Sequence, residues 1–210
     1  MSQKNRIQYF TLTAIFMAIV VLQNFVPGLG YLPFGAVIFG AKITIIQITV
    51  ALSAVTLGPK TGTFIGFLWG VLSLITAWAS PVDIAAIMFR NPLTAIIPRA
   101  LIGLIIGLLF NRFWRNKKGA DRALGLTFLG GLSAAINTIF VILFAWIQFS
   151  LIDPNITGIP SGAGEIFNWF FTAIVGVNGI FELIANAIVF PIIATAVLLI
   201  VEKRNIKGEI

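Results

Sequence analysis

The 210-residue sequence contains neither cysteine nor histidine. Without cysteine the chain has no disulfide bond, no thiol nucleophile and no zinc site of the usual kinds, and without histidine no imidazole can serve as a general base. The P-loop pattern G-x-x-x-x-G-K-[ST] is also absent, because "GPKTGTFIG" has the wrong order, so we expect no ATP hydrolysis by this chain. We therefore expect no metal, no cofactor and no enzymatic activity.

Charged residues are scarce as well. Only 10% of the residues are charged and 59% are hydrophobic, whereas a soluble domain carries about 25% charged residues. Apolar runs of about 20 residues recur along the whole chain, which predicts an all-α integral membrane protein, a helix bundle in the lipid bilayer. The net charge of +7 could suggest a nucleic-acid partner. The basic residues lie next to the hydrophobic runs, however, so we interpret them as topology determinants and expect no nucleic acid.

The breaks between these runs divide the chain into helices. Glycine and proline clusters such as Val26-Pro27-Gly28 and Gly58-Pro59-Lys60 end helices, and "GLGYLPFGAVIFGAK" is too broken for a straight helix. We expect that Gly/aromatic segment to fold back onto the protein. We predict one transmembrane domain, residues 1–210, with six spans at about 7–25, 43–57, 61–79, 93–113, 123–150 and 167–201.

Six spans place both termini on one side of the membrane. Eleven of the fourteen basic residues fall on that side: Lys4, Arg6, Lys60, Arg112, Arg115, Lys117, Lys118, Arg122, Lys203, Arg204 and Lys207. Basic residues concentrate on the cytoplasmic side of membrane proteins. We therefore predict a multi-pass protein of the cell membrane with its N- and C-termini in the cytoplasm.

The three remaining basic residues, Lys42, Arg90 and Arg99, lie on the outward half of this topology. Arg99 follows Leu93 by six positions, about 9 Å along a helix, which places it inside the outer leaflet. A charge at that depth marks a functional site by default, although snorkelling to the head groups is the alternative. Because few acids lie on the same side, we expect a cationic pocket suited to a small anion, and a guanidinium binds a carboxylate better than an ammonium does.

Polar residues inside the predicted spans suggest the rest of such a pocket. Asn178, Glu182 and Asn186 share one helical stripe, and Asn137 lies near the middle of the preceding span. Asparagine and glutamate at this depth must face protein or water rather than lipid. Interhelical hydrogen bonding is the simpler explanation for any one of them. Other polar or aromatic candidates for the wall are Thr44, Gln47 and Trp69.

Small residues recur at intervals of four in several spans. Ala14 and Ala18 line one face of the first span, and Gly62, Gly66 and Gly70 line the third. Such faces let helices approach closely and usually mark contacts within the bundle. On the first span, a flat alanine face could also dock a partner subunit.

Together these features resemble the substrate-binding S components of energy-coupling factor (ECF) vitamin transporters. The similarity covers nearly the whole chain, and the segments "LGYLPFG", "ITIIQITVALSAVTLGPKTG", "FIGFLWGVLSLI" and "FRNPLTAIIPRALIGLIIGL" resemble the pantothenate-specific branch. The resemblance implies a bacterial subunit that captures the vitamin outside the cell. A transmembrane coupling protein and two cytoplasmic ATPases would be its partners, with Ala14 and Ala18 contacting the coupling protein.

Pantothenate is a monoanion with an amide, two hydroxyls and a gem-dimethyl group. The resemblance and the polar pattern together suggest that Arg90 or Arg99 binds the carboxylate, while Asn91, Asn137, Asn178, Thr44 and Gln47 hydrogen-bond the amide and hydroxyls. Trp69, Tyr31 and Phe34 would cover the dimethyl end. Glu182 either pairs with an arginine or is protonated and donates a hydrogen bond.

Other interpretations remain open at this point. The chain could be an S component for a different small vitamin or metabolite, such as folate, riboflavin or a thiamine precursor. It could also be a structural or chaperone-like membrane subunit outside the ECF family. An intramembrane enzyme would need clustered carboxylates or a histidine, and the spans offer one acid and no histidine.

Overall fold

The computed structural model describes residues 3–32, 43–80, 84–152 and 179–203. The predicted site residues Phe34 and Asn178, and residues 167–178 of the last predicted span, lie outside the described residues. The helices are α1 (Gln3–Phe25), α2 (Ile46–Leu57), α3 (Pro59–Ala79), α4 (Ile84–Phe89), α5 (Pro92–Leu109), α6 (Gly119–Ile147) and α8 (Ile180–Lys203), with π-helical turns η2 (Phe110–Trp114) and η3 (Gln148–Ile152) and two short strands, β1 (Tyr31–Leu32) and β2 (Ile43–Thr44).

Five of the described helices are long and apolar enough to cross a membrane: α1, α3, α5 with η2, α6 with η3, and α8. Their outer surfaces carry large exposed hydrophobic side chains such as Phe10, Phe128 and Ile192. The chain is therefore a multi-pass membrane protein. Helix α2 has 12 residues, which span about 18 Å at 1.5 Å per residue, less than the roughly 30 Å hydrocarbon core. The expected number of six membrane crossings stays a prediction.

The helices differ from the sequence expectations at four places. Helix α2 begins at Ile46 rather than Ile43, because residues 43–44 pair with another strand. The connection between the predicted spans 61–79 and 93–113 contains the short helix α4. The apolar runs of α5 and α6 end in π-helical turns, η2 and η3, which no local pattern indicated.

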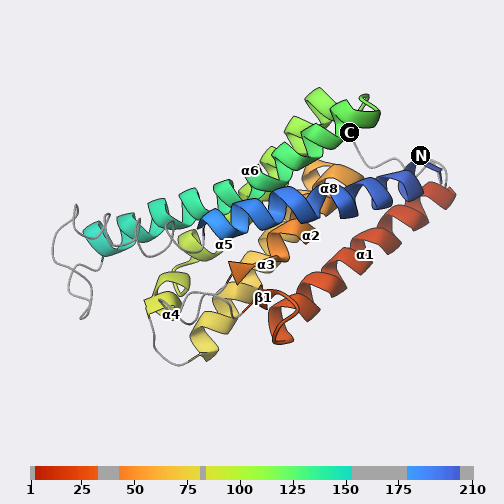
Figure 1. Ribbon diagram of the computed structural model, residues 1–210. Coiled ribbons are helices and arrows are strands. Elements are labelled where there is room, and N and C mark those ends of the chain that lie inside the picture. The colour runs from red at the N-terminus through yellow and green to blue at the C-terminus, as the bar shows by residue number, and fades with distance from the viewer. Residues whose placement is uncertain (1–2, 33–42, 81–83, 153–178, 204–210) are drawn as a thin grey trace.

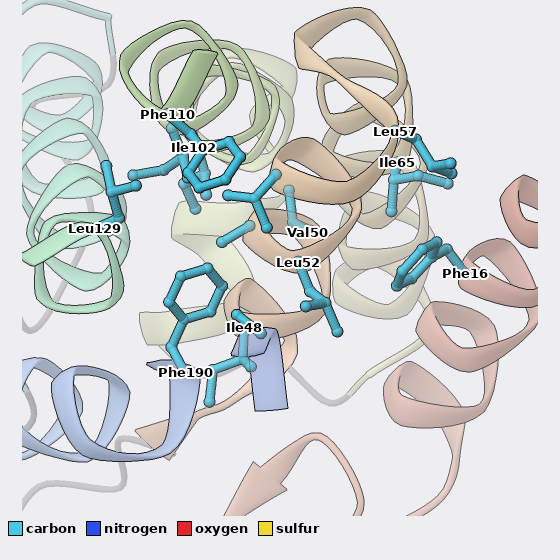
Figure 2. Packing of buried hydrophobic residues seen from close by; sticks show 14 of the residues in the cluster. Phe16, Ile48, Val50, Leu52, Leu57, Ile65, Ile102, Phe110, Leu129 and Phe190 are labelled. Atoms are coloured by element: carbon cyan, nitrogen blue, oxygen red, sulfur yellow. The ribbon is translucent and has the colours of Figure 1, made fainter. Parts of the chain in front are cut away.

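Helix α2 occupies the centre of the bundle (Figure 1). All twelve of its residues are buried, and it contacts α1, α3, α5, α6 and α8. Its sequence is apolar on every face, which is typical of a helix surrounded by protein. In Figure 2, Ile48, Val50 and Leu52 of this helix meet side chains from α1, α5, α6 and α8. The hydrophobic core is therefore organised around a short, fully enclosed helix.

Helices α3 and α5 form the most extensive contact between any two of the described elements. Small residues on both helices permit this approach. A Cβ added at Gly70 of α3 would lie 2.6 Å from the Cα of Ile96, and a Cβ added at Gly107 of α5 would lie 2.6 Å from the Cα of Pro59. The turn before α3 depends on Gly58, whose φ of +102° is strained for other residues, followed by a proline at the first helical position. The glycines thus let the backbone of α5 lie directly against that of α3, and Gly58 sets the turn at which α3 begins.

The predicted folded-back segment begins as a strand. Strand β1 pairs with β2 in antiparallel register, with Tyr31 opposite Thr44 and Leu32 opposite Ile43, and Ile45 N donates to the carbonyl oxygen of Gly30 at 2.9 Å. This pairing brings Tyr31 next to the N-terminal end of α2. It also explains why α2 starts late, since residues used for strand pairing cannot continue the helix.

The start of α1, the turn between η2 and α6, and the end of α8 lie at the same end of the molecule (Figure 1). The connection between α3 and α5, with α4, lies at the opposite end. Arg90 lies in this connection, between α4 and α5, and Arg99 lies within α5.

Candidate binding site

Arg99 is buried within the helix bundle and does not extend to the surface. Only 3% of its surface is exposed, and its Nη1 donates a hydrogen bond to the carbonyl oxygen of Thr94 at 2.7 Å. Its guanidinium carbon lies 5.0 Å from the centroid of the Trp69 ring and 4.4 Å from that of the Phe89 ring. Both distances are within the range of cation–π contacts. The side chain is therefore held by α3, α4 and α5, and the snorkelling alternative does not describe it.

These partners of Arg99 are neutral. Within residues 3–32, 43–80, 84–152 and 179–203 the ion pair found is Arg122–Glu202, at 2.6 Å between the N-terminal turn of α6 and the C-terminal end of α8. The Nε of Arg99 is buried and has no hydrogen-bond partner among the described residues. Glu182, which is also buried, interacts electrostatically with Arg99, but the two do not form an ion pair among the described residues. A buried cation without a directly paired counter-ion is costly unless an anion is supplied. The geometry therefore favours binding of an anionic group from outside the protein.

Arg90 has different surroundings. Its Nε donates to the carbonyl oxygen of Ala77 at 3.1 Å and its Nη2 to that of Ser80 at 3.2 Å, both at the C-terminal end of α3. The guanidinium also lies 5.2 Å from the ring centroid of Trp78, which is largely exposed. Carbonyls at a helix C-terminus lack helical donors, and a cation there is favourable. Arg90 thus acts as a cap for α3 in this structure.

Asn91 also has a structural partner. Its Oδ1 accepts a hydrogen bond from the backbone N–H of Leu93 at 2.9 Å, which makes it the N-cap of α5, directly before Pro92 at the first helical position. Its side chain is partly exposed. One of its acceptors is therefore already used in starting the helix that carries Arg99.

A second polar cluster surrounds Glu182 near the N-terminal end of α8. Glu182 is 5% exposed, its Oε1 accepts from the backbone N–H of Thr44 at 2.7 Å, and its Oε2 accepts from Gln47 Nε2 at 3.5 Å. Asn186 Nδ2 donates to the carbonyl oxygen of Glu182 at 2.6 Å. Gln47 Oε1 and Asn186 Oδ1 are buried without a described hydrogen-bond partner. Three of the predicted residues, Thr44, Gln47 and Glu182, are therefore brought together, with acceptors left over.

Aromatic side chains connect the strand pair to the helices. The Nε1 of Trp69 donates to the hydroxyl oxygen of Tyr31 at 3.4 Å, and that hydroxyl donates to Asn24 Oδ1 at 3.5 Å. Asn24 Nδ2 in turn donates to the hydroxyl of Thr76 at 2.9 Å. Since Tyr31 faces Thr44 across the strands and Trp69 lies beside Arg99, these contacts join the Arg99 side to the Glu182 side.

Asn137 lies on α6 and is buried, with no described partner for its Oδ1. No hydrogen bond among the described residues connects it to Glu182 or Arg99. Its role as a ligand of the substrate stays a prediction, as do those of Phe34 and Asn178.

The structure adds residues that the sequence did not single out. Ser73 on α3 and Thr94 on α5 have buried hydroxyls without a described partner, and Phe89 contacts the Arg99 guanidinium. Phe89 could not be found locally, since its contact depends on the position of α4. The Pro98-Arg99 pair was a usable signal, because an interior proline leaves a helix carbonyl without a donor.

Ala14 and Ala18 are both exposed on α1, as are Ile15, Ile19 and Leu22. The opposite side of α1 contributes Phe16 and Val20 to the core, and Figure 2 shows Phe16 there. The two alanines are thus on a face that the described residues leave uncovered.

Among the described residues no group of three or more acids could hold a metal ion.

A buried guanidinium held by neutral groups, together with nearby amide and hydroxyl groups, makes this region the candidate binding site of a multi-pass helical membrane protein. Comparison with known families gives the class. Residues 8–194 match the family model described as ECF transporter, substrate-specific component. The chain belongs to this family, as its resemblance to S components implied, and it is a transporter subunit.

Two curated proteins are similar over nearly their full lengths. The "Pantothenate transporter PanT" of Leuconostoc mesenteroides subsp. mesenteroides is 48% identical over 204 residues, which cover 97% of this chain and 98% of the relative. The "Pantothenic acid transporter PanT" of Lactococcus lactis subsp. cremoris is 24% identical, with 93% and 94% of the two chains covered.

Proposed function

We propose that this chain captures pantothenate on the extracellular side of a bacterial membrane and delivers it inward with an ECF coupling protein and two cytoplasmic ATPases. The observation that carries the substrate assignment is Arg99, a buried cation with neutral partners among the described residues. A monoanionic carboxylate supplies the missing charge. The name of the 48%-identical relative supports pantothenate as the acid.

In this proposal the ligand's carboxylate binds Arg99, and its hydroxyls and amide are hydrogen-bonded by the cluster of Gln47, Glu182 and Asn186. Glu182 already accepts bonds from Thr44 and Gln47, so its carboxylate would act as an acceptor for ligand hydroxyls. The rings of Trp69 and Tyr31 would cover the apolar dimethyl end. Arg90 and Asn91 would stabilise the helix ends that position Arg99.

The proposed orientation places the N-terminal end of α1, the η2–α6 turn and the C-terminal end of α8 in the cytoplasm. The turn and the helix ends beside it carry Arg112, Arg115, Lys117, Lys118 and Arg122, as expected for a cytoplasmic loop. The exposed Ala14–Ala18 face of α1 would contact the coupling protein. Labelling of single cysteines placed at residues 117 and 79 with a membrane-impermeant thiol reagent tests the orientation, because only residue 79 would react in intact cells.

Substrate binding is tested with the purified subunit in detergent. Isothermal titration with pantothenate, with its neutral alcohol analogue pantothenol and with riboflavin, folate and thiamine should show tight binding of pantothenate alone. Pantothenol lacks the carboxylate and should bind at least about 100-fold more weakly, or about 2.7 kcal/mol. Equal affinity for pantothenate and pantothenol would contradict the charge assignment, and selective binding of another vitamin would replace the substrate.

A further inference from the structure

The proline at position 98 lies inside α5, directly before Arg99. In an α-helix the carbonyl of Thr94 would accept a hydrogen bond from the N–H of residue 98. Proline has no N–H, so this bond cannot form. Thr94 is fully buried, and water cannot readily replace the missing donor. The sequence of α5 therefore leaves one buried carbonyl, that of Thr94, in need of a donor.

The donor to this carbonyl is the side chain of Arg99. Nη1 of Arg99 lies 2.7 Å from the carbonyl oxygen of Thr94, a short distance consistent with a charge-assisted hydrogen bond. The guanidinium is thus folded back along its own helix by a group five residues earlier. Without this acceptor its remaining described contacts would be with the Trp69 and Phe89 rings. A ring contact does not determine which N–H group of the guanidinium points toward the ligand.

We propose that Pro98 is a positioning residue for the anion site: by removing one backbone N–H it keeps the Thr94 carbonyl available to orient the Arg99 guanidinium toward the ligand's carboxylate. This inference rests on the proposed function of Arg99. One N–H group binds Thr94, and the buried Nε, which has no described partner, is among those left for the ligand. The carbonyl is neutral, so it orients the cation without neutralising its charge.

Helix α8 offers a matched control. Pro191 is also an interior proline, and its missing N–H would have bonded to the carbonyl of Ala187. In the described residues no side chain donates to that carbonyl. Replacing Pro191 by alanine therefore makes the same chemical change in a long helix, without altering the contacts of an arginine.

The test compares Pro98→Ala, Pro98→Gly and Pro191→Ala with the unmodified subunit. Alanine and glycine both restore the N–H but differ in volume, which separates the hydrogen-bond effect from a packing effect. Because the restored N–H competes for Thr94, we expect both Pro98 variants to bind pantothenate about tenfold more weakly, equivalent to about 1.4 kcal/mol. Pantothenol binding should change by less than about twofold, and Pro191→Ala should leave both ligands unaffected.

Pantothenate affinity within about twofold of the unmodified protein in either Pro98 variant would overturn the inference. Equal losses for pantothenate and pantothenol would also overturn it, because they would indicate a purely structural role. A readout without ligand keeps the two proposals separable. Nitrogen-15 NMR of the Arg99 guanidinium should show slow rotation about Nε–Cζ in the unmodified protein and faster rotation in both Pro98 variants. If unmodified protein binds no pantothenate, the proposed substrate fails, and the NMR comparison alone decides the role of Pro98.

Discussion

Arg90 and Arg99 are nine residues apart and flank the same helix start, yet they serve different purposes in the structure. Arg90 binds the carbonyls of Ala77 and Ser80 at the end of α3 and lies over an exposed tryptophan. Arg99 is buried between two rings with a single backbone acceptor. The comparison shows that two arginines close in sequence can differ in burial and in the number of backbone acceptors they bind. Arg90 caps a helix, and Arg99 is the one that we propose binds the anion.

The largest expected effect is at Arg99. We predict that Arg99→Gln lowers pantothenate affinity by at least about 100-fold, because a buried charge pair loses about 2–5 kcal/mol when one partner is removed. Arg90→Gln should change affinity by less than about threefold, since its donors bind helix carbonyls. Binding of radiolabelled pantothenate to purified protein measures both. A large loss for Arg90→Gln with normal binding by Arg99→Gln would exchange the two roles.

The next effect concerns the backbone that carries Arg99. A Cβ at Gly66 would overlap the carbonyl group of Arg99, whereas a Cβ at Gly131 on α6 would have ordinary contacts, the nearest atoms being 3.7 Å away. Gly66→Ala should therefore destabilise the protein by about 1–3 kcal/mol, as overpacking does, and should weaken pantothenate binding by separating α3 from α5.

Gly131→Ala is the matched control for that substitution. It should leave binding unchanged and should not lower the thermal midpoint, because alanine is the better helix former. Thermal unfolding of the ligand-free protein followed by fluorescence measures both variants. Equal stability of the two would show that the α3–α5 approach tolerates a methyl group.

The sequence was most informative where the pattern is local. Apolar runs and the Gly58-Pro59 break predict α2 and α3, and the offset of Arg99 from the helix start predicts its depth. The first turn of α2 could not be predicted, because residues 43–44 pair with a strand twelve positions away. The different surroundings of the two arginines also depend on non-local contacts, with the end of α3 for Arg90 and with α3 and α4 for Arg99.

Asn91 shows the opposite case, a local signal that sequence analysis interpreted differently. Asparagine before a proline at the first helical position is a typical N-cap, yet the expectation was that Asn91 contacts the ligand. In the structure its Oδ1 binds the N–H of Leu93. The cap begins the same helix that presents Arg99, so it contributes to the site through the position of the backbone.

The smallest expected effect follows from this assignment and distinguishes a cap from a ligand contact. Asn91→Ala should lower the free energy of unfolding by about 1 kcal/mol through loss of the cap, and should change pantothenate affinity by less than about threefold. Asn91→Ser keeps a side-chain acceptor for the N–H of Leu93 and should recover the stability. Its shorter hydroxyl would not replace an amide that reaches a ligand, so a contact role predicts that serine restores stability but leaves pantothenate affinity reduced. Thermal unfolding and calorimetric titration of the two variants therefore decide whether the Arg90–Arg99 segment binds the vitamin with one side chain or with two.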